Sequence, residues 1–268
     1  MDTANNMYNP KKVAIVTGAG SGIGQALAGV LAAQGTAIVA VGRTAKPLED
    51  LRSALAEQAE VAVLAVDVTK DEAPALAVRT ALDRFGRLDY LVNNAGIGKP
   101  QPVDETADDT LDYFLNVHLR APFRFCREAL HAMKDGAAIV NVSSSFALVG
   151  GLRGGAYSAA KAGIIGLSKH MAAQYGQRGI RTNVVAPGVL ETPMTAYAWE
   201  QPRFRRMNFD MTPLNRTGTA LDAANAIAFL LSDTARFING EVLAVDGGWS
   251  STKFLSEAAA TAVALRGE

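Results

Sequence analysis

Two side chains near the middle of the chain have types and a spacing that suit proton transfer. Tyr157 and Lys161 stand four residues apart at the start of a helical pattern. Residues at i and i+4 of a helix lie on one face. An ammonium group beside a phenol favours the phenolate, whose free pKa is about 10. The pair predicts a tyrosine that exchanges a proton at neutral pH. Because such a pair also occurs on ordinary surfaces, the rest of the chain must supply a cofactor, a second donor and a pocket.

A glycine-rich loop near the start of the chain suits a cofactor phosphate. The apolar run at 12–16 leads into Thr17-Gly18-Ala19-Gly20-Ser21-Gly22-Ile23-Gly24, and a helical pattern follows at 23–34. Glycines allow a tight turn and a close approach to a pyrophosphate, while a helix N-terminus offers free N–H groups and a favourable dipole. This context predicts a dinucleotide site. The alternative is a glycine-rich turn in a sheet protein that binds no ligand.

The residues after the second apolar run indicate which nicotinamide cofactor is used. An acidic residue there would hydrogen-bond the ribose hydroxyls of NAD, but Gly42 occupies the place and Arg43 follows. A guanidinium can hold a 2′-phosphate through charge-assisted hydrogen bonds. The sequence therefore predicts NADP(H) in preference to NAD(H). A solvated loop arginine, with NAD(H) as cofactor, is the alternative.

Short unalternating apolar runs alternate with helical patterns, which is typical of a parallel sheet buried on both faces. We expect strands at 12–16, 37–41, 61–66, 88–92, 138–142, 181–185 and 241–245, and helices at 23–34, 48–58, 71–85, 106–133 (bent near Pro122), 156–175 and 221–231. The crossover rule then gives an α/β, three-layer doubly wound (Rossmann) fold, a seven-stranded parallel sheet with helices on both faces. We expect one domain at 11–250, a mobile extension at 1–10 and a tail at 251–268 that could form a short helix.

Several motifs together resemble those of the short-chain dehydrogenases/reductases. They are the Gly18/Gly22/Gly24 spacing, Asn93-Asn94-Ala95-Gly96, Tyr157/Lys161, Pro187-Gly188 and Val245-Asp246-Gly247-Gly248. The resemblance covers about 12–249 and is to the compact single-domain branch, with a general similarity to 3-oxoacyl-[acyl-carrier-protein] reductases. It implies an NAD(P)-dependent oxidoreductase. Family members commonly pair two helices between subunits, and the apolar helical patterns at 106–133 and 156–175 suit that role, so we expect a homotetramer.

The resemblance also implies where the cofactor lies. Asp67 and the backbone of Val68 would meet the adenine, although a helix cap or turn role is the alternative for Asp67. The backbone of Val189 and the hydroxyl of Thr192 would meet the nicotinamide carboxamide, and Lys161 the ribose. The full expected cofactor set is Gly18, Gly20, Ser21, Gly22, Ile23, Gly24, Arg43, Asp67, Val68, Asn94, Ala95, Gly96, Tyr157, Lys161, Pro187, Gly188, Val189 and Thr192.

Hydride transfer to a carbonyl places negative charge on oxygen, so a donor must stabilise that charge and an acid must protonate it. Three serines, 143–145, follow the fifth strand, and the family's serine lies thirteen residues before its tyrosine, which selects Ser144. Asn116 stands in an apolar helical stretch and resembles the family's fourth catalytic residue, which holds a water joined to the lysine. A satisfied buried amide is the alternative for Asn116. The expected catalytic set is Asn116, Ser144, Tyr157 and Lys161.

Composition excludes several other classes of function. The 268 residues are 49% hydrophobic, and 26 Lys+Arg balance 26 Asp+Glu, so neither a nucleic-acid footprint nor a membrane-surface patch is indicated. No segment is apolar enough to span a bilayer, and the polar start lacks an apolar signal region. We therefore expect a cytoplasmic protein. One cysteine, Cys126, and three scattered histidines predict no disulfide and no metal site.

The segment at about 192–217 is long, weakly periodic and rich in methionine, proline and aromatic residues, which predicts a lid over the substrate. Its apolar content suggests a hydrophobic or cyclic small molecule, while Arg203, Arg205 and Arg206 could attract an acidic group. Our first hypothesis is an NADP(H)-dependent reductase of a ketone, either a 3-oxoacyl group or a cyclic carbonyl. The alternatives are an NAD-dependent dehydrogenase of a cyclic alcohol, steroid or sugar, and a non-catalytic dinucleotide sensor.

Overall fold

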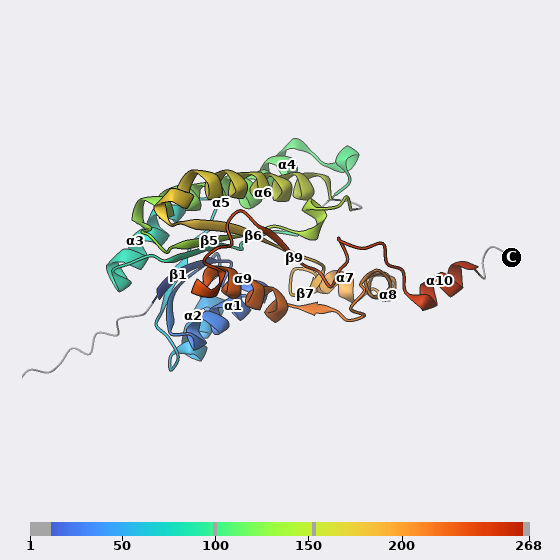
Figure 1. The fold of residues 1–268 in the computed structure, drawn as a ribbon, viewed down its shortest axis with the longest axis horizontal. Helices are drawn as coiled ribbons and strands as arrows, with labels where there is room; N and C mark the ends of the chain where they lie inside the picture. The colour runs from blue at the N-terminus through green and yellow to red at the C-terminus, as the bar shows by residue number, and fades with distance from the viewer. Residues whose placement is uncertain (1–11, 99–100, 152–153, 265–268) are drawn as a thin grey trace, which may run out of the picture.

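A single parallel sheet forms the centre of the molecule (Figure 1). The structure, a computed structural model, describes residues 12–98, 101–151 and 154–264. Within these ranges the main sheet has seven strands in the order β3-β2-β1-β4-β5-β6-β9, which confirms the predicted doubly wound fold. The strands are β1 (Lys12–Thr17), β2 (Thr36–Gly42), β3 (Val61–Ala65), β4 (Tyr90–Asn93), β5 (Ala138–Val142), β6 (Arg181–Pro187) and β9 (Val242–Val245).

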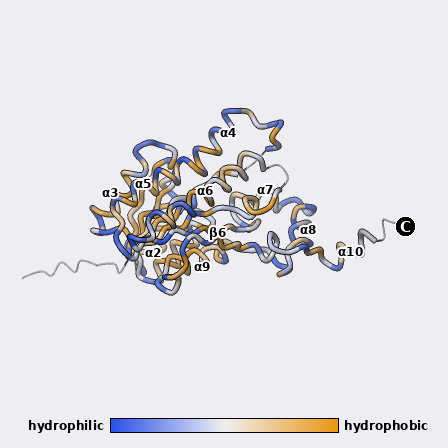
Figure 2. Tube along the Cα trace, turned by 45° about the horizontal axis from the view of Figure 1, so that its top comes forward, coloured by the Kyte–Doolittle hydropathy of each residue, from blue (hydrophilic) through white to orange (hydrophobic). Residues whose placement is uncertain are grey.

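Helices cover both faces of this sheet because each central strand is apolar on both sides. Ala14 and Val16 of β1 belong to a core with α1 (Gly22–Ala33), α2 (Ala45–Leu55) and α9 (Ala220–Leu231). Val13 and Ile15 belong to a second core with α3 (Ala73–Phe85), α5 (Ala121–Ala132) and α6 (Gly155–Tyr175). Figure 1 shows the two helical layers on opposite sides of the strands, and Figure 2 shows hydrophobic residues concentrated around β6.

The strand order changes direction at β1, which has β2 on one side and β4 on the other. In open parallel sheets, ligands bind beyond the carboxyl ends of the strands at such a switch point. Hydrogen bonds join these two strand ends: the Thr17 hydroxyl accepts from the backbone N–H groups of Asn94 (2.9 Å) and Ala95 (3.0 Å). The Asn94 amide donates to the Thr17 carbonyl at 2.9 Å. The floor of the crevice is therefore fixed by side chains of the predicted motifs.

The predicted helix over 106–133, bent near Pro122, is continuous helical backbone over 108–132 with an irregular turn directly before Pro122. The structure has α4 (Asp108–Leu115), a π-helical turn η2 (Asn116–Arg120) and then α5. Pro122 lies in the first turn of α5, where proline is tolerated. Because Pro122 has no N–H to donate to the carbonyl of His118, four residues earlier, the α-helical hydrogen bonding is interrupted inside η2. The irregularity therefore precedes Pro122 and includes Asn116.

The predicted lid also contains more regular structure than its sequence indicated. It holds two short helices, α7 (Ala196–Trp199) and α8 (Pro202–Met211), and is flanked by strands β7 (Leu190–Glu191) and β8 (Gly218–Thr219), which pair with each other. The Trp199 and Phe204 rings meet edge to face at 5.3 Å, which joins the two helices. Short 3-10 turns lie at Val103–Glu105, Ser145–Ala147, Gly176–Arg178 and Asp233–Ala235.

The structure describes most of the tail at 251–268. In the tail, a helix α10 (Glu257–Ala264) forms beyond the lid and projects away from the body in Figure 1. The expected mobile extension at 1–10 lies outside the described residues. Within the described ranges, no helix combines the length and apolar character required to cross a membrane.

Candidate active site

Two neighbouring cavities open at the carboxyl end of the sheet, one on each side of the glycine-rich loop. The first, of about 220 Å³, lies between the ends of β2, β3 and β4 and is lined by residues that include Gly20, Arg43, Asp67 and Val68. The second, of about 200 Å³, is lined by 20 residues, Ser144, Tyr157 and Lys161 among them. Both cavities are bordered by Gly18, Ser21, Ala95 and Gly96. An elongated ligand that crosses the loop would therefore occupy both.

The glycine-rich loop has the geometry that a phosphate cradle requires. Gly18 and Gly22 adopt φ angles of +69° and +55°, which side chains disfavour. A Cβ atom on Gly24 would lie 2.2 Å from the Gly18 carbonyl oxygen, so the start of α1 packs directly on the loop. Ser21, at the N-cap of α1, makes no side-chain capping bond. The first N–H groups of α1 thus remain available to an anion, and the loop fits a pyrophosphate.

The first cavity contains a cationic group where the sequence predicted one. Arg43 Nη1 donates to the Tyr113 hydroxyl at 3.4 Å, so a side chain of α4 closes this cavity from the side opposite β2. The Asp67 carboxylate accepts from the N–H (2.9 Å) and hydroxyl (2.8 Å) of Thr69, which is a turn-forming contact. Burial opposes ionisation of Asp67, but the Thr69 hydrogen bonds and the charges of Arg43 and Lys70 outweigh it, and its pKa is lowered. Asp67 therefore both shapes the turn and lines the cavity.

The second cavity brings together three of the four predicted catalytic residues. Tyr157 and Lys161 lie in the first two turns of α6, and Ser144 follows β5. Ser144 and Tyr157 line this cavity together, and Ser144 partly offsets the burial that raises the pKa of the Tyr157 phenol, while the Ser144 Oγ accepts from the Phe146 N–H at 3.2 Å. Ser143 is directed elsewhere, because its hydroxyl donates to the Lys161 carbonyl at 2.8 Å. The geometry thus separates a serine that meets the tyrosine from one that braces the helix.

The charge state of the pair differs from the sequence expectation. Burial raises the pKa of Tyr157, and Ser144 only partly offsets this. Burial also lowers the pKa of Lys161 to about 7. Lys161 Nζ donates to the Val142 carbonyl at 2.7 Å and lies 5.8 Å from the centre of the Tyr157 ring. Lys161 therefore lies beside the phenol ring and holds its own proton weakly. By itself it does not lower the pKa of Tyr157.

Asn116 lies in the π-helical turn and is absent from the lining of both cavities. Its Oδ1 is buried and has no hydrogen-bond partner among the described residues. The alternative expectation of a satisfied amide is therefore wrong for this oxygen. Internal water molecules commonly donate a hydrogen bond to an unpaired buried acceptor of this kind.

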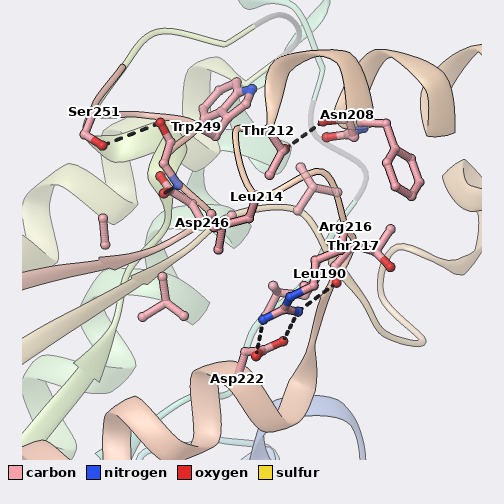
Figure 3. A pocket seen from close by; sticks show the side chains of 18 of the residues that line it. Leu190, Asn208, Thr212, Leu214, Arg216, Thr217, Asp222, Asp246, Trp249 and Ser251 are labelled. Atoms are coloured by element: carbon pink, nitrogen blue, oxygen red, sulfur yellow. Dashed lines mark hydrogen bonds and ion pairs between the residues drawn. The ribbon is translucent and has the colours of Figure 1, made fainter. Parts of the chain in front are cut away.

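Residues after β6 border the second cavity from the lid side. Pro187, at the end of β6, lines it with Gly188 and Thr192, as do Gly22, Ile23 and Asn94, so the predicted cofactor residues divide between this cavity and the first, while Gly24 lines neither. Val189 does not line it but borders a third cavity of about 370 Å³ (Figure 3). That cavity lies beneath α8, next to the ion pair in which Arg216 and Asp222 approach to 2.8 Å. Gly188 and Leu190 line both the second and the third cavity and form the wall between them.

Sequence reasoning missed two residues of this region. His118 lines the second cavity and contacts Tyr157, and Tyr113 meets Arg43 across the first cavity. A histidine two residues after Asn116 was the only available signal for the first, and Tyr113 offered none because its contact joins residues 70 apart. Among the described residues, no group of three or more His, Cys, Asp or Glu is placed to hold a metal ion.

Comparison with known proteins gives a consistent picture. A family model described as "Enoyl-(Acyl carrier protein) reductase" matches residues 18–250. Levodione reductase of Leifsonia aquatica is 38% identical over 257 residues, which are 90% of this chain and 94% of that protein. Cis-4-hydroxycyclohexanecarboxylate dehydrogenase of Sinomonas cyclohexanicum is 39% identical over 245 residues, with coverage of 90% and 97%.

Two further comparisons concern length and fold. An uncharacterized short-chain type dehydrogenase/reductase of Sinorhizobium fredii is 40% identical over 255 residues, but the chain spans only 45% of its length. A crystal structure of levodione reductase superimposes with a TM-score of 0.86 at 34% identity, covering 90% of this chain and 98% of that one.

Proposed function

The chain is an oxidoreductase of the short-chain dehydrogenase/reductase family, and from this premise we propose that it interconverts a ketone and a secondary alcohol with NADP(H) as cofactor. The observation that carries this proposal is that Ser144, Tyr157 and Lys161 line one cavity that borders the glycine-rich loop. The bound cofactor would supply the hydride. The chain's own residues would supply the proton and the charge stabilisation.

Ser144 and Tyr157 would both donate hydrogen bonds to the carbonyl oxygen, which stabilises the negative charge that develops there. Tyr157 would then give its proton to that oxygen in reduction and take it back in oxidation. Its raised pKa keeps the phenol protonated at neutral pH, which is the state that reduction needs.

Lys161 has N–H groups beyond the one bonded to Val142 and would use them to hold the cofactor ribose. A lysine with a pKa of about 7 can also pass a proton toward Tyr157. Asn116 would hold a water near Lys161 through its unpaired oxygen.

The preference for NADP(H) is supported by Arg43, which lines the first cavity and is not followed or preceded by a carboxylate at the end of β2. Its guanidinium and the Tyr113 hydroxyl lie within 3.4 Å of each other, so both could donate to one phosphate. An NAD-dependent dehydrogenase remains the second candidate, since one relative is named for the oxidation of a cyclic alcohol.

A cyclic, largely apolar ketone is the substrate class that we propose. The second cavity has an apolar wall from the lid, with Leu190, Pro193 and Met194 facing the catalytic side chains. Two relatives are named for substituted six-membered rings, levodione and 4-hydroxycyclohexanecarboxylate.

The test is a substrate panel of levodione, 4-oxocyclohexanecarboxylate and an acetoacetyl thioester, each with NADPH and with NADH, followed by absorbance of the reduced nicotinamide. We expect faster turnover of the cyclic ketones with NADPH. Tight NADPH binding without turnover of any ketone would favour the sensor hypothesis, and faster turnover with NADH would overturn the cofactor assignment.

We also propose a homotetramer, supported by large apolar side chains that are exposed in the single chain. They include Phe123 on α5, Leu221 and Phe229 on α9, and Phe237, which is 100% exposed. Light scattering should give the mass of four chains of 28.1 kDa. A monomeric mass at micromolar concentration would contradict this proposal.

A further inference from the structure

Tyr157 packs against a stacked pair of aromatic rings that come from outside its own helix. The Phe114 and His118 rings stack with their centres 5.7 Å apart. Each then meets the Tyr157 ring nearly at right angles, at 6.4 Å for Phe114 and 5.1 Å for His118. Edge-to-face contacts of this kind fix the orientation of an aromatic ring. Of the two rings that meet Tyr157, His118 is the nearer and the one with polar ring atoms.

His118 is itself fixed from the opposite side. It is 1% exposed, and its Nε2 lies 3.1 Å from the carbonyl oxygen and 3.3 Å from the nitrogen of Ile97. Whichever tautomer the ring adopts, Nε2 has a partner in the Ile97 backbone. A Cβ atom on Gly96 would lie 2.9 Å from Cε1 of His118, so the ring packs tightly against the end of the β4 motif. The Ile97 backbone and the stacked Phe114 thus hold the ring from two sides, while its Nδ1 is buried without a hydrogen-bond partner among the described residues.

The position of His118 in the chain depends on the π-helical turn. His118 lies in the middle of η2. Its carbonyl has no α-helical donor, because the residue four positions later, Pro122, has no N–H. A π-helical turn at this place rotates the side chains of α5 about the helix axis relative to those of α4. Such turns are frequent at functional sites. In η2 the buried side chains are Val117 and His118, and only His118 borders the cavity of Tyr157.

His118 carries no charge at physiological pH. Burial and the nearby Lys161 ammonium lower the pKa of His118 to about 2, against a weaker opposing effect of its Ile97 hydrogen bond. The titratable groups that face it are Tyr157 and Lys161, both of α6. An uncharged ring neither repels Lys161 nor competes with Tyr157 as a proton donor. Its contribution to the site is therefore geometric, together with the exclusion of water from one side of the phenol.

We propose that His118 is a positioning residue for the reaction: its ring, by its edge-to-face contact, holds the Tyr157 ring in the orientation that directs the phenol toward the substrate oxygen. The inference rests on the proposed role of Tyr157 as acid and base. It goes beyond that role because it assigns a function to a side chain outside the Asn116, Ser144, Tyr157 and Lys161 set.

The experiment compares His118→Phe, which keeps a ring against Tyr157 but loses the Ile97 bond, with His118→Ala, which loses both. His131→Ala is the matched control, because His131 is exposed on α5. Levodione reduction with NADPH is measured between pH 6 and 10. We expect kcat to fall about tenfold in His118→Ala, from the worth of an aromatic pair, and to stay within about threefold of wild type in His118→Phe. The KM for NADPH should not change in either.

The pH profile is the readout that a merely structural role would not move. Because burial raises the pKa of Tyr157, removal of the His118 ring admits water and lowers that pKa. Reduction requires the protonated phenol, so the alkaline fall of kcat/KM should move to lower pH in His118→Ala and keep its place in His118→Phe.

Wild-type kcat and an unmoved alkaline limb in His118→Ala would overturn the inference, as would equal losses in the Ala and Phe variants. If His118→Ala does not fold, His118→Leu takes its place, since it keeps apolar volume without a ring. Tyr157→Phe separates the two levels of the argument. Full activity in Tyr157→Phe refutes the proposed function, whereas an inactive Tyr157→Phe beside a fully active His118→Ala refutes only the role of His118.

Discussion

Replacement of Lys161 by methionine should stabilise the protein without cofactor while it removes turnover. Methionine has a similar length and fills the same volume without a charge. Lys161 is 5% exposed, and burial lowers its pKa from 10.5 to about 7. Below pH 7 the lysine is protonated in both the folded and the unfolded chain, so the full cost of burying the charge is present there. As pH rises from 7 to 10.5, the folded chain loses the proton first and that cost disappears.

The two pKa values set the size of the effect. Their difference corresponds to about 5 kcal/mol at pH 6, and about 2 kcal/mol of this remains at pH 9. The substitution also removes the 2.7 Å hydrogen bond to the Val142 carbonyl, which contributes about 2 kcal/mol. Lys161→Met should therefore be more stable than wild type by about 3 kcal/mol at pH 6 and about equal to it at pH 9.

Urea unfolding at pH 6, 7.5 and 9, followed by circular dichroism, measures this difference directly. Lys169→Met is the control, because Lys169 is an exposed lysine of the same helix and should show little change at any pH. A Lys161→Met protein that is less stable than wild type at pH 6, or whose advantage does not vary with pH, would refute the reasoning about the buried charge.

Three further predictions concern the cofactor and the proton. Tyr157→Phe should reduce turnover by at least about a hundredfold, since it removes the proton donor, while fluorescence titration shows unchanged NADPH binding; near-normal turnover would exclude Tyr157 as the acid. Arg43→Asp should lower the ratio of kcat/KM with NADPH to kcat/KM with NADH by at least about tenfold, because a charge-assisted contact is lost. Arg52→Asp is the control, and an unchanged ratio in Arg43→Asp would contradict the assignment. Gly24→Ala should weaken NADPH binding by about tenfold or more, because its Cβ would lie 2.2 Å from the Gly18 carbonyl; Gly29→Ala in the same helix, with nothing within 4 Å, should bind as wild type does.

The parts of the fold that the sequence predicted are those in which local pattern and burial agree. β1 and β2 are apolar at successive positions because both faces of each strand are covered, and this pattern is visible in the sequence. Gly18, Gly22 and Gly24 are required by backbone geometry and so stand at fixed spacing. The choice of Ser144 came from a resemblance and stays a prediction; the structure shows that the Ser143 hydroxyl donates to the Lys161 carbonyl.

The parts that could not be predicted depend on contacts between distant segments. The π-helical turn at 116–120 follows from the missing N–H of Pro122, but a proline that causes such a turn and a proline that starts a separate helix look alike in sequence. α7 and α8 are too short for periodicity to reveal them, and the Trp199 indole donates to the Leu190 carbonyl at 3.2 Å, a contact that exists only in the folded lid.

The wall between the second and third cavities has a consequence for the divergence of substrate range. The Leu190 carbonyl is held by the Trp199 indole and the Thr195 hydroxyl, so its backbone is fixed independently of its side chain. That side chain occupies space left by Gly218, where a Cβ atom would lie 2.5 Å from Leu190 Cδ2. Two residues line both cavities, of about 200 Å³ and 370 Å³: Leu190 contributes its side chain to the wall, and Gly188 contributes only backbone. We therefore expect a smaller residue at Leu190 to open the two cavities to each other while Ser144, Tyr157 and Lys161, which lie on other elements, keep their places.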